Sequence, residues 1–286
     1  MKTFASLAAR LIRASNVLDR AYHRLDRARA LLVTAYASDA VLAAYNDIAY
    51  GTTPTYDAGT AQFREKLFNW EADLVRQVFP GPPSRVLVGG AGGGREAFQL
   101  AAMGYTVTAF EPSPALAASM RDRAAQTGAA VEALLGRYEE MPLLRHVGSG
   151  EPRDLSGDRF SAALIGWSSL SHLRDAAARI ATLRAFADVT DGPVAASFFL
   201  RRPAASRPHR ARKFLGTLGR RREGDSFTPN IGFFHFSSRE ELAGEVAAAG
   251  LAIVAASYDE TDGHWPWIAV ARPEVAARLA GESPAS

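Results

Sequence analysis

A glycine-rich loop and one acidic side chain are the residues of this 286-residue chain best suited to chemistry. The loop, Gly89-Gly90-Ala91-Gly92-Gly93-Gly94, follows the apolar run 85–88 and precedes the helix-like residues 95–100. A second apolar run, 106–110, ends on Glu111. Glycine lets backbone approach a ligand without a Cβ in the way, and an acid at the end of the second strand accepts hydrogen bonds from both hydroxyls of a ribose. This order of strand, loop, helix and strand predicts a site for a nucleoside cofactor.

The spacing of the glycines distinguishes two kinds of cofactor. The dinucleotide fingerprint G-x-G-x-x-G, started at Gly90, requires a glycine where the chain has Arg95. A frame started at Gly92 satisfies G-x-G-x-x-A, but it begins well past the end of the predicted strand. The frame Gly90-x-Gly92-x-Gly94 fits better, and it resembles motif I of the class I S-adenosylmethionine-dependent methyltransferases. A nicotinamide-dependent oxidoreductase remains an alternative with a weaker glycine fit.

The resemblance covers residues 56–273 and implies a complete fold. The segments similar to the family are 134–142 (third strand and adenine loop), 160–167 (fourth strand), 194–200 (fifth strand) and 236–251 (the helix before the sixth strand). The implied fold is α/β, a Rossmann-like seven-stranded sheet with the last strand antiparallel, plus an N-terminal helical extension. The predicted units are a helical extension and lid over 1–55, a methyltransferase domain over 56–276 with a basic insertion at 201–230, and a tail over 277–286.

The resemblance also implies which residues contact S-adenosylmethionine. These residues are Tyr56, Gly90, Ala91, Gly92, Gly94, Glu111, Pro112, Ser113, Tyr138, Glu139, Gly166 and Trp167. In this assignment the glycines hold the methionine end, Glu111 holds the ribose, and the residues after the second and third strands flank the adenine. Two positions depart from the family. Val88 stands where an acid usually helps to hold the methionine amino group, and Arg137 stands where an aspartate often lies near the adenine amino group.

Three histidines are candidates for contact with the methyl acceptor. In an open α/β sheet the site lies beyond the carboxyl ends of the strands, and this rule selects His172, His235 and His264. Each is a candidate general base, which is needed only if the acceptor must lose a proton; a surface or capping role is the structural alternative. The chain has no H-E-x-x-H or comparable spacing, so we predict no catalytic metal.

Bulk composition describes an ordinary globular chain, with 48% hydrophobic and 22% charged residues. The absence of cysteine excludes disulfides, thiolate metal sites and cysteine nucleophiles. No run approaches the ~18 apolar residues of a transmembrane helix. Arg10 and Arg13 interrupt any signal-like apolar core, so the cytoplasm is the default expectation.

The first 32 residues repeat apolar side chains at alternating spacings of three and four. The seam consists of Phe4, Leu7, Leu11, Ala14, Leu18, Ala21, Leu25, Ala28 and Leu32. This pattern predicts one long helix, or two with a break near Ser15-Asn16. Because residues 1–30 carry seven basic and two acidic side chains, three roles stay open. The favoured one is packing against its own domain or against a twin in a homodimer; an anionic membrane surface and nucleic acid are less favoured.

Aromatic residues follow this helix, and Gly51-Thr52-Thr53-Pro54 interrupts the helical pattern among them. Family members often place such a segment over the cofactor as a lid, which puts Tyr56 at a cofactor contact. Aromatic faces suit a sulfonium cation, although packing in the core is the structural alternative for these side chains.

Basic side chains also gather late in the chain: residues 192–222 carry nine, with no acidic partner among them. Outside this segment and residues 1–30, the chain has 17 basic and 28 acidic side chains. The basic segment suits a clamp for an anionic acceptor, a nucleic-acid patch or a solvated loop. Nucleic acid is not favoured, because the predicted fourth strand ends in Gly166-Trp167-Ser168-Ser169 and lacks the Asn/Asp-Pro-Pro-Tyr tetrapeptide of methyltransferases that act on base amino groups.

Taken together, these features and the family resemblance predict a methyltransferase acting on an oxygen or nitrogen of a small molecule, with an anionic molecule as one candidate acceptor and S-adenosylmethionine as the cofactor. A non-catalytic binding or assembly protein on the same fold, attached through its N-terminal helix, is the alternative from another class. Val88 and Arg137 are the residues that favour this alternative.

Overall fold

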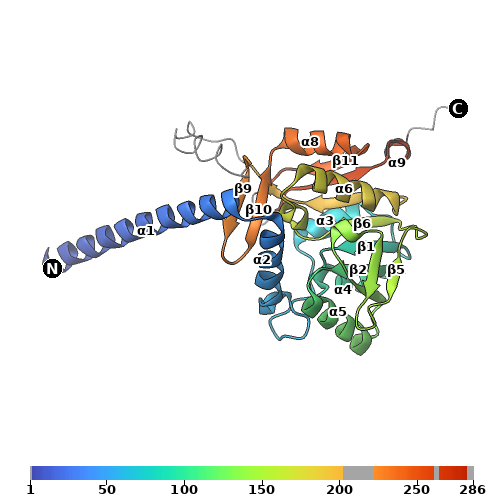
Figure 1. The fold of residues 1–286 in the computed structure, drawn as a ribbon, viewed down its shortest axis with the longest axis horizontal. Helices are drawn as coiled ribbons and strands as arrows, with labels where there is room; N and C mark the ends of the chain where they lie inside the picture. Colours follow the sequence, from blue (N-terminus) through green and yellow to red (C-terminus); the bar gives the residue numbers. More distant parts are fainter. Residues whose placement is uncertain (1, 202–221, 261–263, 282–286) are drawn as a thin grey trace.

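The computed structural model describes residues 2–201, 222–260 and 264–281, built around one large twisted sheet with helices on both faces (Figure 1). Successive side chains of a strand point to opposite faces. Val86 and Val88 therefore join the apolar cluster beneath helices α3 (Asn69–Val78), α4 (Arg95–Ala102) and α5 (Pro114–Thr127), whereas Leu87 joins the cluster beneath α6 (Ala176–Asp188) and α8 (Arg239–Ala248). The two clusters fix the sheet as the middle layer of the domain.

The large sheet contains all seven strands that the family resemblance implies. In spatial order its strands are β11 (Ala252–Ser257), β12 (Trp267–Ala271), β7 (Val194–Ser197), β6 (Ala162–Ile165), β1 (Arg85–Gly89), β2 (Thr106–Glu111), β3 (Val131–Leu135), β4 (Leu143–His146) and β5 (Pro152–Asp154). Strand β12 runs antiparallel to both of its neighbours, which confirms the predicted antiparallel last strand. The predicted count was two short, because β4 and β5 extend the edge and bury Leu144 and Leu155.

Helices connect the strands and cover both faces of the sheet. They are α1 (Lys2–Tyr36), α2 (Asp39–Gly51), α3 (Asn69–Val78), α4 (Arg95–Ala102), α5 (Pro114–Thr127), α6 (Ala176–Asp188), α8 (Arg239–Ala248), α9 (Pro273–Leu279) and the 3₁₀ turns η1 (Pro54–Tyr56), η2 (Tyr138–Glu140) and η3 (Ser169–His172). Helix α9 crosses the boundary predicted at residue 276, so the predicted tail begins inside a helix.

A second sheet of three strands lies beside the first, in the order β8 (Phe199–Leu200), β10 (Gly232–Ser237) and β9 (Asp225–Thr228). Strand β9 lies within the predicted insertion at 201–230. Phe227 of this strand and Phe233 pack with Leu42 of α2 in a small core of their own. Residues 202–221 of the insertion lie outside the described part of the chain.

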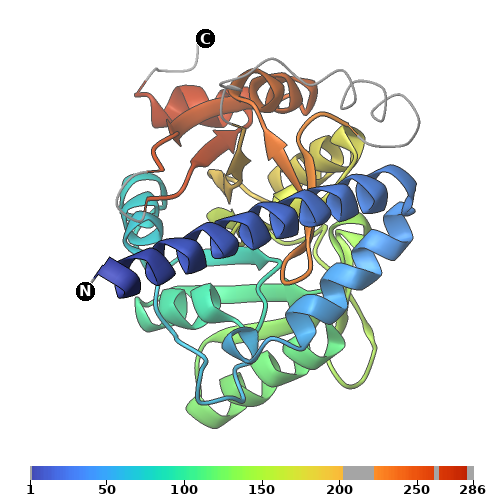
Figure 2. The same cartoon turned by 90° about the vertical axis from the view of Figure 1, so that its left-hand side faces the viewer.

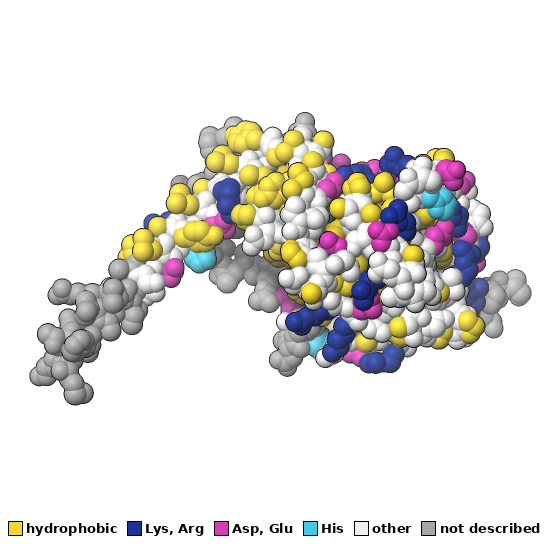
Figure 3. Space-filling model, turned by 90° about the horizontal axis from the view of Figure 1, so that it is seen from below, with side chains coloured by type: hydrophobic (Ala, Val, Ile, Leu, Met, Phe, Trp, Pro, Cys, Tyr) yellow, Lys and Arg dark blue, Asp and Glu magenta, His cyan; other side chains and the backbone are white. Residues whose placement is uncertain are grey.

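Helix α1 is continuous through Ser15-Asn16 and projects away from the body of the molecule (Figures 1 and 2). Its carboxyl-terminal end packs on the domain, where it contacts β9 and buries Thr34 and Ala35. Leu18 and Leu25 are 70% and 72% exposed. The seam residues from 18 to 32 are exposed and do not pack on the described part of their own domain (Figure 3). One of the two favoured interpretations required such packing. Among the described helices, none is long and apolar enough to cross a membrane.

Candidate active site

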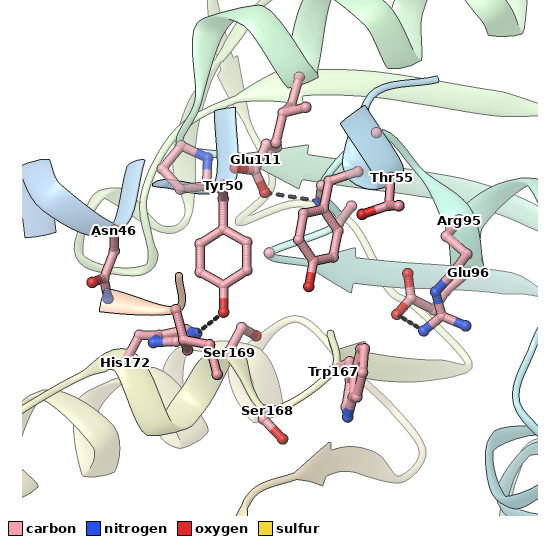
Figure 4. Close-up of a pocket in the computed structure, with 18 of the residues that line it drawn as sticks. Asn46, Tyr50, Thr55, Arg95, Glu96, Glu111, Trp167, Ser168, Ser169 and His172 are labelled. Atoms are coloured by element: carbon pink, nitrogen blue, oxygen red, sulfur yellow. Dashed lines mark hydrogen bonds and ion pairs between the residues drawn. The ribbon is translucent and has the colours of Figure 1, made fainter. Parts of the chain in front are cut away.

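A cavity of about 1180 Å³ opens at the carboxyl ends of β1, β2 and β6 (Figure 4). The glycine loop forms its floor, residues 43–69 cover it, and the residues that follow β6 form a third wall. Drug-sized ligands occupy pockets of roughly 300–1,000 Å³. The cavity therefore has room for a nucleoside cofactor and a second small molecule side by side.

The glycine loop presents bare backbone to this cavity. Gly92 has a φ of 56°, in the left-handed region that glycine adopts freely, and a Cβ placed there would meet no atom within 4 Å. At Gly93 a Cβ would lie 2.2 Å from the carbonyl oxygen of Tyr56, so the covering segment touches the loop directly. Gly92 thus faces the space that a ligand would fill, and Gly93 holds the cover in place.

Glu111 ends β2 with its carboxylate buried beside Gly92. One carboxylate oxygen accepts a hydrogen bond of 2.9 Å from the Gly92 amide, and the other accepts one of 3.1 Å from the Ser113 amide. Burial raises the pKa of Glu111 to about 7, against the opposing effect of these two hydrogen bonds. The two backbone donors fix the orientation of the carboxylate.

We expect the raised pKa of Glu111 to make nucleoside binding depend on pH. As the pH falls through about 7, Glu111 gains a proton and becomes a weaker acceptor for ribose hydroxyls. We expect the dissociation constant of S-adenosylhomocysteine to be constant well above pH 7 and to rise by up to about tenfold per pH unit below it. Calorimetric titrations across this range measure the effect. The matched variant Glu111→Gln should bind more weakly and without this dependence, and a wild-type affinity that ignores pH would contradict the assignment.

An arginine and two glutamates form a buried ionic cluster at the start of α4. The Arg95 guanidinium donates to both carboxylate oxygens of Glu71, at 2.7 and 2.6 Å, and to Glu96 at 2.5 Å. Burial raises the pKa of Glu71 to about 7, and the hydrogen bond from Arg95 opposes that rise. Glu96 also lines the cavity, whereas Val88 is fully buried in the core.

Removing the arginine from this cluster should cost the fold much more than removing a surface arginine. Arg95→Ala leaves Glu71 and Glu96 buried without a cation, and losing one partner of a buried pair costs about 3–5 kcal/mol of unfolding free energy. Arg85→Ala is the matched control, since its 2.6 Å pair with Asp158 leaves Arg85 44% exposed. Such a pair contributes at most about 1 kcal/mol. Urea unfolding measures both losses, and equal values would contradict the role given to the cluster.

Tyr50 and His172 form a hydrogen-bonded pair across the cavity (Figure 4). His172 Nδ1 lies 2.6 Å from the carbonyl oxygen of Phe233, which can only accept, so Nδ1 carries the hydrogen. His172 Nε2 is then the acceptor and receives the Tyr50 hydroxyl at 2.8 Å. Burial lowers the pKa of His172, opposed by its hydrogen bond to Phe233. The lowered pKa favours the neutral imidazole, whose one basic nitrogen is occupied by the Tyr50 hydroxyl.

Helix α2 holds this arrangement as a lid with three separate contacts. Besides the contact of Tyr50, Asn46 exchanges two hydrogen bonds with the backbone of Phe233, at 2.8 and 3.0 Å. Asp47 pairs with Arg137. The cation at the unusual position 137 is therefore neutralised by the lid. The sequence pattern did not identify Asn46, Asp47 or Tyr50, and their only local signal is a polar face on an otherwise apolar helix.

Aromatic rings line the wall next to His172. The Trp167 ring meets Phe68 and Trp265 edge to face, with centroids 4.8 and 5.5 Å apart, and Phe199 continues the wall at 5.4 Å from Trp265. The Trp265 indole nitrogen donates to the Ser168 hydroxyl at 2.7 Å, which fixes the plane of that ring. The wall suits a flat apolar molecule.

Most of the predicted site residues border the cavity. Those that line it are Tyr56, Gly90, Ala91, Gly92, Glu111, Pro112, Tyr138, Glu139, Trp167 and His172. Gly94, Ser113 and Gly166 lie behind the lining and position it. Gly94 begins α4 at a φ of 92°, Ser113 begins α5, and the Gly166 amide donates to the Gly89 carbonyl at 2.7 Å. Within the described residues, no cluster of side chains is suited to hold a metal ion.

Two of the three candidate histidines, His235 and His264, do not line the cavity. His235 is 1% exposed, with Nδ1 2.9 Å from Asp225 and Nε2 2.9 Å from Glu241. It joins β9, β10 and α8, which is a structural role. His264 is exposed and does not line the cavity, whereas its neighbour Trp265 does.

Solved structures of other proteins share this fold, although the sequence comparisons find no match. No protein-family model and no curated protein matches the chain. Among solved structures, the CcbJ methyltransferase from Streptomyces caelestis is similar over 80% of this chain and 97% of its own, at 17% identity and a TM-score of 0.53. Mitomycin 7-O-methyltransferase MmcR has 19% identity and a TM-score of 0.48 over 71% of this chain, which spans about half (53%) of that enzyme. The described part of the chain has the fold of the class I S-adenosylmethionine-dependent methyltransferases.

Proposed function

We propose that this protein is an S-adenosylmethionine-dependent methyltransferase that modifies an oxygen or nitrogen of a small molecule. The observation that carries the proposal is the pairing of Glu111 with the open backbone of Gly92. The buried carboxylate is fixed by two amide donors at the end of β2, next to a glycine whose Cβ position faces empty space. The hydroxyls of a ribose would donate to this carboxylate, as they do to the acid at the end of the second strand in Rossmann-like nucleotide sites.

The neighbouring residues would hold the cofactor in one orientation. Gly90 and Gly92 would face its methionine end, where Glu96 supplies a carboxylate for the amino group. Pro112 and the η2 turn would flank the adenine. The bound sulfonium supplies the methyl group. The chain's own contribution is then to align the acceptor with that methyl group and to exclude water beneath the lid.

The acceptor is best described as a small, largely flat molecule with a hydroxyl group near His172. The neutral imidazole can take the proton that a hydroxyl loses on methylation, and the wall of Trp167 and Trp265 suits a ring system. Arg64 and Lys66 also line the cavity, which supports an anionic group elsewhere on the acceptor. We further propose a cytoplasmic protein in which α1 serves self-association.

Calorimetric titration with S-adenosylhomocysteine, with NADH in parallel, tests this function. We expect a dissociation constant on the order of micromolar for S-adenosylhomocysteine, about −8 kcal/mol, and no binding of NADH. Binding of NADH alone would replace the proposal with an oxidoreductase. Binding of neither compound by folded protein would replace it with the non-catalytic alternative.

A further inference from the structure

A side chain of the lid, Asn46, takes the place of a neighbouring strand beside Phe233 of β10. Strand β9 lies along one edge of β10, and β8 pairs with the other edge at Phe236 and Ser237. The Phe233 amide donates to Asn46 Oδ1 at 2.8 Å, and the Phe233 carbonyl accepts from Asn46 Nδ2 at 3.0 Å. Residues paired across an antiparallel ladder exchange the same two hydrogen bonds.

Both partners of this contact are suited to it by residue type. Asn46 is buried, at 7% exposed, and its amide group combines a donor and an acceptor, which an aspartate or a leucine does not. Gly232, just before Phe233, has a φ of 81°, and a Cβ there would overlap Asn46 Oδ1. The glycine therefore lets the lid helix come close enough for its amide to reach the strand.

The same carbonyl also holds the candidate base. The Phe233 oxygen accepts from His172 Nδ1 at 2.6 Å as well as from Asn46 Nδ2. A carbonyl oxygen has two lone pairs, so it can accept both bonds. Which ring nitrogen of a neutral histidine carries the hydrogen depends on the hydrogen bonds that the ring makes. The direction of the Phe233 carbonyl, which Asn46 helps to fix, therefore bears on the tautomer of His172.

The lid contacts the other ring nitrogen as well. Tyr50 follows Asn46 by four residues, which places both side chains on one face of α2, the face toward His172 (Figure 4). The Tyr50 hydroxyl lies 2.8 Å from His172 Nε2. With the hydrogen on Nδ1, the lone pair is on Nε2, where the hydroxyl of a methyl acceptor could replace that of Tyr50. With the hydrogen on Nε2, this nitrogen could take no proton.

We propose that Asn46 is a positioning residue for His172: by holding the Phe233 carbonyl, it keeps the imidazole hydrogen on Nδ1 and the lone pair on Nε2. The docked lid thus prepares the base before a methyl acceptor binds. The use of this lone pair in methyl transfer rests on the proposed function, whereas the position of the hydrogen can be measured in the protein alone.

Nitrogen-15 spectra of the full chain with labelled histidine report this tautomer. The chain has six histidines, and the His172 signals are those lost in His172→Gln. At about pH 8, above the ordinary pKa of histidine, we expect a hydrogen on Nδ1 of the wild type. Asn46→Leu removes both hydrogen bonds and should move part of the population to the Nε2–H form. Tyr45→Phe is the control: it loses a 3.0 Å bond from the same helix to Pro229, and should keep the wild-type tautomer.

A second pair of variants displaces Asn46 without replacing it. Gly232→Ala puts a Cβ against Asn46 Oδ1, so we expect the same shift toward the Nε2–H tautomer. Gly250→Ala is its control for backbone strain, because Gly250 has a φ of 77°, against 81° at Gly232, and no atom within 4 Å of a Cβ. This control should leave the tautomer of His172 unchanged.

Kinetics connect the tautomer to the reaction. In Asn46→Leu we expect a single-turnover rate about 10–1,000-fold below wild type, short of the roughly 10⁴-fold loss of a base held wholly in the wrong tautomer. The affinity for S-adenosylhomocysteine should not change. An Asn46→Leu variant whose tautomer shifts without any loss of rate would overturn the positioning role.

Three spectroscopic results would also overturn the proposal: a wild-type hydrogen on Nε2, a tautomer unchanged in Asn46→Leu and Gly232→Ala, or an equal shift in the control variants. The last result would make the tautomer a consequence of general loosening of the lid. A failure of the proposed function looks different. Wild-type protein that binds no S-adenosylhomocysteine but shows the tautomer shift in Asn46→Leu would overturn that function and support the effect of Asn46 on His172.

Discussion

Gly92→Asp should lose S-adenosylhomocysteine binding by about 1,000-fold or more while the protein stays folded. The new side chain would extend into open space, because a Cβ at Gly92 meets no protein atom within 4 Å. It would place a second carboxylate beside Glu111 where the cofactor belongs, and an unpaired buried charge costs several kcal/mol. Each ~1.4 kcal/mol is a factor of ten in affinity. Calorimetric titration measures the loss.

The chain offers a matched control for the backbone strain in this variant. Gly128 has a φ of 66°, close to the 56° of Gly92, and likewise has no atom within 4 Å of a Cβ. It ends α5 and does not line the cavity. Gly128→Asp should therefore pay a similar conformational penalty and bind S-adenosylhomocysteine normally. Normal binding of S-adenosylhomocysteine by Gly92→Asp, or equal losses of affinity in both variants, would contradict the assignment of the glycine loop to the cofactor site.

His172→Gln should lower the rate of methyl transfer by about 10²–10⁴-fold, the usual contribution of a general base, and leave cofactor affinity unchanged. The glutamine can still bond Tyr50, but it cannot take the proton of an acceptor hydroxyl. The rate is measured as S-adenosylhomocysteine formed in a single turnover, with the acceptor found by screening phenols and amines against methyl-labelled S-adenosylmethionine. An acceptor that is an amine with no proton to lose would leave the variant active and contradict the base role.

Tyr50→Phe separates the base from the group that covers it. The variant removes the 2.8 Å hydrogen bond to His172 Nε2 and keeps the aromatic ring that meets Tyr56 edge to face. We expect activity within about tenfold of wild type, because the basic nitrogen remains. A Tyr50→Phe variant as inactive as His172→Gln would instead place the tyrosine hydroxyl in the proton transfer.

The local parts of the site could be predicted from the sequence. The run 85–88, the glycines after it and Glu111 at the end of the next run lie within 27 residues, and backbone rules alone bring such a segment together. The seven main strands and the antiparallel last strand were also predicted, through the resemblance to the class I methyltransferase fold. Strands β4 and β5, next to and at the edge of the sheet, are only four and three residues long. Such short strands show no recognisable alternation of apolar and polar residues.

The remaining site depends on contacts between distant residues, which no local period encodes. Three histidines followed strands in the sequence, yet only His172 faces the cavity, because Asp225 and Glu241 hold His235 in the interior. The partner of His172, Tyr50, lies 122 residues away on a helix that sequence reasoning treated as a general lid. The sequence thus predicted the glycine loop and Glu111, which lie close together along the backbone. Tertiary packing alone decided which of the candidate histidines lines the cavity and which of the described side chains of α1 are exposed.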